Sequence, residues 1–405
     1  MSVITVFNGL FCEAGVVVKR VVDATGSRLV SDQEIVADAS ALSGLAEDKI
    51  ARAFQAKTSV FNAFSHEKEQ AIAWMRLAMA NKLAESSELV FPGFVSQLAA
   101  ADINHVLKVC LISEMKDRLA VAERDEGFAE KHAMKLVRKD DEDRAAWVKT
   151  LRGVDDPWTG TLYDIVVPVG STGVEKSADL IVEQLSNVAV QVTDASRAKV
   201  QDFLLAARVE TVLAREGHSV LVSADSGVVS LTINKHVLML EKLEHELAGI
   251  VSGIEGVKDV KTGVGQGFHK TDIYRKADFD IPSKVLLVDD EREFVQTLSE
   301  RLMMRDMGSA VVYDGESALN LVREDEPEVM ILDLKMPGID GIEVLRRVKG
   351  EHPEVEVIIL TGHGSEQDRE TCMGLGAFAY LHKPVDIDVL SQTLKAANEK
   401  IRAAK

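Results

Sequence analysis

Cysteine is scarce in this chain. Its 405 residues include three cysteines, Cys12, Cys110 and Cys372, which are scattered and lack the spacing of metal ligands. We therefore expect them to be small buried apolar side chains in a reducing compartment.

Positive charge is also in short supply. The 47 lysines and arginines are outnumbered by 65 aspartates and glutamates, which gives a net charge of −18 at pH 7. Nucleic-acid binding requires a basic face, so this balance argues against a general nucleic-acid binder and against adhesion to an anionic membrane. Because the sequence also lacks a helix-turn-helix pattern with a basic recognition helix, we expect no direct DNA binding.

Long apolar runs and a basic leader are missing as well. No run approaches the roughly 20 residues of a membrane span, and residues 1–4 lack the basic segment of a secretory signal. We therefore expect a cytoplasmic protein. At 405 residues the chain is too long for a single core, and its length suggests two to three domains.

The C-terminal stretch, residues 283–405, is built from short apolar runs. Each run is bounded by turn residues and separated from the next by an amphipathic segment of helix length. This is the βαβ pattern of an open parallel sheet, in which functional groups gather beyond the carboxyl ends of the strands. The runs are residues 284–288, 329–332, 355–360 and 379–381.

Polar residues follow each of these runs. Asp289 and Asp290 follow the first and Asp333 the second, and three such carboxylates would be too close to stay ionised without a cation. Carboxylate oxygens suit Mg²⁺, which would neutralise charge on an incoming phosphoryl group. Asp333 holds the central position and can act as the nucleophile that forms an acyl phosphate. Thr361 can donate a hydrogen bond to the same group, and Lys383 can pair with its oxygens.

This stretch resembles the receiver domain of bacterial two-component response regulators. The resemblance implies a doubly wound (βα)5 flavodoxin-like fold. It also implies that a histidine kinase or a histidine phosphotransfer protein transfers a phosphoryl group to Asp333. The matching residues are the acidic pair, Asp333 in the sequence LDLKMPGIDG, Thr361, Tyr380, Lys383 and Pro384.

The resemblance also implies roles for individual residues. Thr361 would be drawn to the phosphoryl group, Tyr380 would swing inward, and the Lys383–Pro384 bond would be cis. The alternative is an ordinary α/β fold with polar strand ends, which five role-matched residues in order argue against. The implied magnesium ligands are the side chains of Asp289, Asp290 and Asp333 and the backbone carbonyl of Lys335.

The N-terminus begins where a phosphate-binding loop would lie. We predict a strand at residues 3–7, a loop at 8–15 and a helix at 16–24. The loop pattern G-x-x-x-x-G-K-[ST] cradles phosphates, but only its first glycine is present. The lost lysine and hydroxyl would have contacted the β/γ-phosphates and the magnesium ion. The four motif positions are occupied by Gly9, Ala14, Gly15 and Val16.

Residues 1–186 resemble the cytidylate kinase-like branch of the P-loop nucleoside monophosphate kinases. The best-matched parts are the arginine-bearing helical segment 118–147 and the start of a strand that we predict at 162–167. Besides the degenerate loop, Gly93 is followed by Phe94, where the family tends to have arginine. Both departures fall on positions that handle phosphate.

The arginines of this segment have two interpretations. In the family, lid arginines contact the transferring phosphates. Alternatively, they form a solvated helical face balanced by neighbouring acids, which the damaged loop favours. We therefore predict a binding or homodimerisation module without phosphotransfer, for which a nucleotide ligand stays uncertain. The arginines are Arg118, Arg124, Arg138 and Arg144.

Residues 187–264 predict a small α+β domain with the order α-β-β-α-β. Residues 188–192 form a short strand or linker, and a long amphipathic helix follows at 196–215. The pattern and the ending at 256–260 resemble a BON domain, a family thought to bind lipid or mediate interactions. The glycines and charges of residues 265–282 predict a linker to the receiver-like stretch.

These features predict a phosphorelay response regulator that switches its N-terminal domains or a partner protein. The alternative is a nucleoside monophosphate kinase gated by phosphorylation, against which the lost lysine and hydroxyl count. A third hypothesis, a lipid-facing or envelope-facing adaptor, is disfavoured by the acidic charge and the lack of an export signal.

Overall fold

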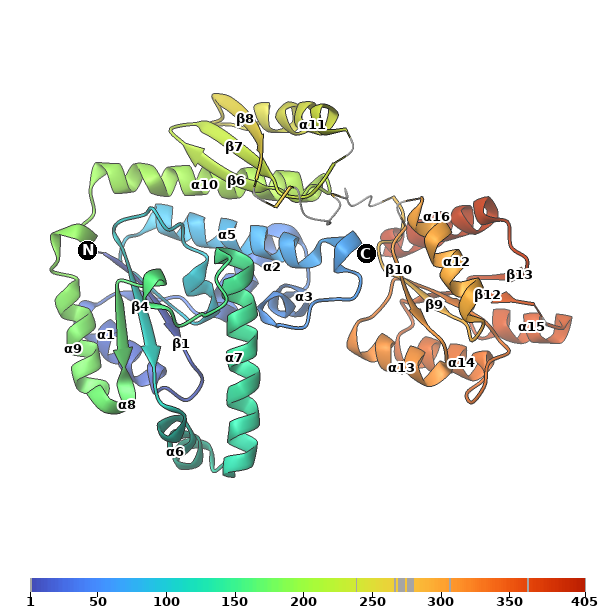
Figure 1. The fold of residues 1–405 in the computed structure, drawn as a ribbon, viewed down its shortest axis with the longest axis horizontal. Helices are drawn as coiled ribbons and strands as arrows, with labels where there is room; N and C mark the ends of the chain where they lie inside the picture. Colours follow the sequence, from blue (N-terminus) through green and yellow to red (C-terminus); the bar gives the residue numbers. More distant parts are fainter. Residues whose placement is uncertain are drawn as a thin grey trace. The chain divides into compact units, whose positions relative to one another are not determined.

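The computed structural model describes residues 2–404 except 238, 266, 269–273, 275–279, 306 and 363. The chain forms two compact units (Figure 1). Most of the predicted linker, 265–282, lies outside the described residues. No helix of the described part is long and apolar enough to cross a membrane. The first unit comprises Met1–Thr58, Glu67–Arg215 and Ser219–Tyr274, and the second Ser59–His66, Glu216–His218 and Arg275–Lys405.

The first unit is built on a five-stranded parallel sheet with the order β2-β3-β1-β4-β5. The central strand, β1, pairs with β3 and β4, so that Ile4 lies opposite Val90 and Leu107. Its continuous apolar run is typical of a strand that is buried on both faces. The strands are β1 (Val3–Asn8), β2 (Arg28–Leu29), β3 (Leu89–Pro92), β4 (Val106–Ile112) and β5 (Ile165–Pro168).

Helices cover both faces of this sheet (Figure 1). On one face, α1 (Ala14–Thr25) and α9 (Val174–Gln184) pack through valine, alanine and isoleucine side chains. On the other, α2 (Asp32–Ser43), α5 (Glu67–Glu85) and α7 (Glu130–Arg152) enclose a larger core with Trp74 and Trp147. The shorter helices of the first unit are α3 (Glu47–Ala51), α6 (Met115–Glu126) and α8 (Val169–Thr172), while α4 (Asn62–Ser65) belongs to the second unit.

Local signals explain where these helices begin and end. Ser31 caps α2 by accepting a hydrogen bond from the Glu34 backbone N–H. Gly26 follows α1 with a φ of 70°, a left-handed conformation that glycine adopts without a steric penalty.

One strand prediction is wrong, and for residues 188–192 the linker alternative holds. Residues 160–162 form a 3₁₀ turn, and the strand begins only at Ile165, because Asp164 turns its carboxylate toward the Lys108 backbone N–H at 2.7 Å. Residues 188–190 form another 3₁₀ turn instead of a strand, fixed by the Asn187 side chain, which accepts from the Ala189 N–H.

The middle of the chain forms the predicted α-β-β-α-β order. β6 (Leu221–Asp225) pairs antiparallel with β7 (Val228–Ile233), and β7 pairs parallel with β8 (Asp259–Val264). The helices are α10 (Asp194–Arg215) and α11 (Leu240–Ser252). Because α10 is apolar on two faces, Phe203 and Ala207 join the core of the first sheet while Val209 and Leu213 join the core of the second.

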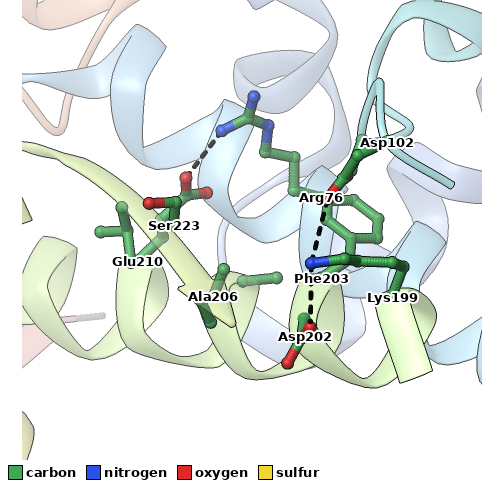
Figure 2. Close-up of a pocket in the computed structure, with 12 residues that line it drawn as sticks. Arg76, Asp102, Lys199, Asp202, Phe203, Ala206, Glu210 and Ser223 are labelled. Carbon is green, nitrogen blue, oxygen red and sulfur yellow. Dashed lines mark hydrogen bonds and ion pairs between the residues drawn. The ribbon is translucent and has the colours of Figure 1, made fainter. Parts of the chain in front are cut away.

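Polar contacts also fix α10 against the first sheet's helices. Figure 2 shows Arg76 of α5 pointing toward Glu210 of α10, with 2.6 Å between their charged atoms. Lys199 of α10 lies between Asp102 and Asp202 and pairs with both. These groups line a small pocket of about 120 Å³ in which each cation is already paired with an acid.

The second unit is a five-stranded parallel sheet with the order β10-β9-β11-β12-β13. One face is covered by α12 and α16 and the other by α13, α14 and α15. The predicted doubly wound fold is confirmed. The elements are β9 (Val285–Val288), α12 (Arg292–Met303), β10 (Ser309–Val312), α13 (Gly315–Glu324), β11 (Val329–Leu332), α14 (Gly341–Glu351), β12 (Glu356–Thr361), α15 (Glu366–Gly374), β13 (Ala379–His382) and α16 (Ile387–Ala404).

Candidate functional site

The carboxyl edge of the second sheet gathers an ammonium and several carboxylates. Asp289 follows β9, Asp333 follows β11, and Lys383 follows β13. The Lys383 Nζ lies 2.7 Å from Asp289 Oδ2 and 3.2 Å from Asp333 Oδ2. Because both carboxylates are only 4% exposed, this ammonium is their main counter-charge within the described residues.

Burial and ion pairing shape the electrostatics of this edge. Burial raises the pKa of Asp289, an effect that its hydrogen bond with Lys383 opposes. Burial alone would lower the pKa of Lys383, but its hydrogen bonds to Asp289 and Glu291 outweigh that effect and raise the pKa to about 12. The ammonium therefore stays charged at every physiological pH.

The carboxylates fit a hard divalent cation. One oxygen each from Asp289, Asp290 and Asp333 lie within 4.8 Å of one another. Oxygen donors at such separations, with one side open to solvent, match the preference of Mg²⁺ for few protein ligands and several waters. Lys335, whose backbone carbonyl is the fourth predicted ligand, follows two residues after Asp333 and has an exposed side chain.

The backbone around Asp333 is held closely. The Leu334 N–H donates to Asp333 Oδ1 at 2.7 Å, and the Gly341 N–H donates to the Leu334 carbonyl at 3.0 Å. A Cβ on Gly341 would overlap the Asp333 carbonyl oxygen and lie 2.7 Å from the Leu334 Cα. Glycine is therefore required where α14 begins, because the chain passes directly beside Asp333.

Thr361 and Tyr380 lie on the neighbouring strands. Thr361 ends β12 and is fully buried, and its carbonyl accepts from the Lys383 N–H at 3.0 Å. Tyr380 packs against the core cluster on the α13 and α14 face, and its buried hydroxyl, beside Gly364, has no hydrogen-bond partner in the described part of the chain. The Lys383–Pro384 peptide bond is cis.

A second group of charges surrounds the loop after β1 in the first unit. The Leu10 N–H donates to Asp140 Oδ2 at 3.1 Å, and Arg144 Nε donates to the same oxygen at 2.6 Å. Arg118 donates to the Leu10 carbonyl at 2.7 Å and forms two 2.9 Å hydrogen bonds with Asp141. Carboxylates of α7 thus take the backbone N–H and the guanidinium groups that a phosphate would need.

The remaining motif residues of this loop are less engaged. Gly9 lets Arg118 approach closely, since a Cβ there would meet the guanidinium at 3.2 Å. Ala14 is buried at the start of α1, while Gly15 and Val16 are exposed. None of the three offers a charge or a hydroxyl to a phosphate.

The four arginines do not form one solvated face. Arg118 and Arg144 are each 6% exposed, so that interpretation is wrong for them. Arg124 is exposed and pairs with Asp125 and Glu13, and Arg138 is exposed on α7. The arrangement is a buried pair of ion-paired arginines with two outlying ones.

At Gly93–Phe94, where the sequence departs from the family pattern, protein groups also occupy the site. Asp32 accepts hydrogen bonds from the N–H groups of Phe94 and Val95 at 3.1 and 2.8 Å. The Phe94 ring stacks on Phe54 at 5.0 Å and lies 4.4 Å beneath the Arg144 guanidinium. A carboxylate and a packed aromatic ring therefore occupy a second place where phosphate would be handled.

Comparisons with known proteins match both sheets. The model of the response regulator receiver domain matches residues 285–395, and that of the cytidylate kinase-like family matches residues 3–171. The transcriptional regulatory protein CpxR of Escherichia coli K12 is 40% identical over 114 residues, 28% of this chain and 48% of CpxR. The response regulator MprA of Mycobacterium tuberculosis H37Rv is 31% identical over 113 residues, 28% of this chain and 49% of MprA.

The C-terminal unit of this chain is a receiver domain. The chain spans about half the length of the curated relatives that it matches. Among solved structures, the receiver domain protein from Clostridium thermocellum is 32% identical, covering 30% of this chain and 98% of that protein, with a TM-score of 0.29. The N-terminal region is similar to the cytidylate kinase-like family over residues 3–171, and the BON-like character of the middle domain stays a prediction.

The sequence did not predict the role of one residue of the receiver domain. Glu291 lies 3.0 Å from the Lys383 Nζ through its Oε1 and so becomes a third carboxylate on that ammonium. The position of Glu291 two residues after Asp289 could have indicated this role. Asp289 Oδ1 accepts a hydrogen bond from the Glu291 N–H at 2.9 Å. Asp140, Asp141 and Asp32 of the kinase-like region were also missed, because no sequence pattern links them to the loops they contact.

Proposed function

We propose that the receiver domain accepts a phosphoryl group on Asp333 from a phosphohistidine of a histidine kinase or a histidine phosphotransfer protein. The P–N bond to the histidine breaks as a P–O bond to Asp333 forms. The observation that carries the proposal is the ammonium of Lys383, 3.2 Å from the buried Asp333 carboxylate and placed to pair with the new phosphoryl oxygens.

In this proposal the side chains of Asp289, Asp290 and Asp333 and the Lys335 carbonyl would hold Mg²⁺. When bound, the ion would neutralise charge on the phosphoryl oxygens. Lys383 offsets part of the repulsion that would otherwise keep an anionic donor away from this acidic edge.

Phosphorylation then shifts the population of two conformations. The phosphoryl oxygens draw the Thr361 hydroxyl, and Tyr380 fills the space that this movement opens. The Tyr380 hydroxyl, which no described residue pairs with, supports the idea, because a buried donor without a partner can gain a hydrogen bond when its surroundings rearrange. The repacked face would then act on the other domains or on a protein partner.

We propose four segments for the chain: a kinase-like domain at 1–186, a BON-like domain at 187–264, a linker at 265–282 and the receiver domain at 283–405. In the first segment, carboxylates accept hydrogen bonds from Leu10, Arg118 and Phe94 and so occupy the places where phosphate would bind. This supports a binding module without phosphotransfer. Assaying the full chain for transfer of a phosphoryl group from ATP to CMP, with and without beryllofluoride as the phosphoryl mimic on Asp333, tests this role. We expect no transfer; formation of ADP and CDP would overturn it.

Phosphorylation is tested with a small phosphodonor and Mg²⁺ on the full-length protein. We expect a single acid-labile phosphate that Asp333→Asn abolishes and EDTA suppresses. Labelling of Asp333→Asn at the wild-type rate would refute the assignment.

A further inference from the structure

A second pocket in the first unit lies away from every group discussed so far. It has a volume of about 290 Å³ and is formed by the end of α5, the residue before β4 and the first turns of α10. Ser86 and Ser87 precede β3, and His105 precedes β4, so the pocket lies at the amino edge of the parallel sheet. The loop after β1, which resembles a phosphate-binding loop, is at the opposite, carboxyl edge.

His105 is the unusual group in this pocket. The residue is only 2% exposed, yet its buried Nδ1 has no hydrogen-bond partner among the described residues. Its backbone is fixed, since its carbonyl accepts from the Val3 N–H at 3.0 Å as β4 pairs with β1. A buried polar atom that stays unpaired costs about 1–3 kcal/mol.

Arg197 provides a charge beside this ring. Its side chain is exposed on α10, lines the pocket, and makes no ion pair with any described residue. This separates the pocket from the one in Figure 2, where Arg76 and Lys199 are paired with acids that line the same pocket. Burial, and then the charge of Arg197, lower the pKa of His105, so the ring is neutral at pH 7 and carries one N–H.

The other walls combine hydroxyls with apolar surface. Ser86 and Ser87 offer two hydroxyl groups, and the buried Leu83 and Val200 exclude water from one side. Glu85 also lines the pocket as an exposed carboxylate, and it forms no ion pair with Arg197 or with any other described residue. The pocket therefore holds an uncommitted cation and an uncommitted carboxylate together.

We propose that this pocket binds a small metabolite through its phosphate or carboxylate group, held by Arg197, the His105 ring N–H and the serine hydroxyls. Guanidinium and hydroxyl donors suit either anion. The volume exceeds that of an inorganic ion, so the anionic group belongs to a larger small molecule. Because α5, β4 and α10 all contribute, the ligand would connect the kinase-like core to the helix that also supports the three-stranded sheet.

Calorimetric titration of the full-length protein tests this site, with inorganic phosphate in one arm and acetate in the other. Both arms contain EDTA, so that magnesium-dependent binding at the receiver domain does not contribute. We expect saturable binding in at least one arm, and the arm that binds identifies the anion. Losing a charged hydrogen bond in Arg197→Ala should weaken binding by about tenfold or more.

Two further variants make the test specific. Glu85→Gln removes a like charge and should tighten binding severalfold, the opposite direction to Arg197→Ala. Arg208→Ala, which removes an exposed arginine of α10 outside the pocket, should leave binding unchanged. All three positions are exposed, so the variants are expected to fold. No saturable binding of either anion, or equal binding by all three variants, would overturn the proposal.

Discussion

At the scale of single residues, the receiver site depends on one ammonium shared by three carboxylates. Lys383→Met would leave Asp289 and Asp333 buried without their counter-charge. We expect the free energy of unfolding to fall by about 1–3 kcal/mol in metal-free buffer, and Mg²⁺ to restore part of the loss by replacing the missing charge. Urea unfolding with and without Mg²⁺ measures both effects.

The matched control for that variant is Lys395→Met. Lys395 is exposed on α16 and pairs with no described acid, so its removal should change the unfolding free energy by less than about 0.5 kcal/mol. An equal loss in both variants, or a Lys383 effect indifferent to Mg²⁺, would contradict the account.

The Lys383 contribution also has a defined pH dependence. Its pKa is raised from 10.5 to about 12 in the folded protein, so protonation favours folding. The stability it adds is fully present below the unfolded pKa of 10.5 and is lost as the pH rises through about 12. The difference in unfolding free energy between wild type and Lys383→Met should therefore stay constant up to about pH 10 and shrink above it. A difference that disappears near neutral pH would argue against this pairing.

At the scale of elements, the start of α14 sets the geometry of Asp333. Gly341→Ala would force a Cβ into the Asp333 carbonyl, so we expect a loss of about 1–3 kcal/mol in stability and slower phosphorylation. Gly350, in the same helix, has open space around its Cα. Gly350→Ala should be neutral or stabilising by up to about 1 kcal/mol, because alanine favours the helix. Thermal unfolding and labelling rates of the two variants separate local crowding from helix propensity.

Helix α7 carries the acids that occupy the loop after β1. Asp140→Asn would weaken the hydrogen bonds to Leu10 and Arg144, and since Arg144 is buried we expect a loss of about 1–3 kcal/mol. Glu142→Gln, on an exposed position of the same helix, is the control and should be near neutral. Denaturant unfolding measures both, and equal stability of the two variants would mean that the carboxylate on the loop contributes nothing.

The elements differ in how far the sequence could predict them. Strand β9 is a continuous buried apolar run, so its sequence predicts a strand. Strand β10 at Ser309–Val312 is only half-buried and follows a short turn, so its apolar pattern was too weak to predict a strand. The contact of Asp140 with Leu10 spans 130 residues and depends on how α7 lies over the sheet. Periodicity predicts the helix but not that packing, so the occupied loop could not be foreseen.

At the scale of the whole molecule, topology explains why part of the site was predictable. Parallel strands place their carboxyl ends on one edge, so residues that follow separate apolar runs, such as Asp289, Asp333 and Lys383, must gather there. Glu291 was missed because it approaches Lys383 from the loop after β9 and not from a strand end. The amphipathic pattern of α10 predicted one inward face, whereas its helix serves two cores.

In our proposal, Asp333 is the residue that carries the phosphoryl group. The most direct measurement is to phosphorylate the full-length protein with a small phosphodonor and Mg²⁺, trap acyl phosphates by borohydride reduction, and map the product by peptide mass spectrometry. We expect Asp333 to be the reduced residue and Asp289 and Asp290 to be unchanged. A trapped product at another residue, with Asp333 intact, would contradict it.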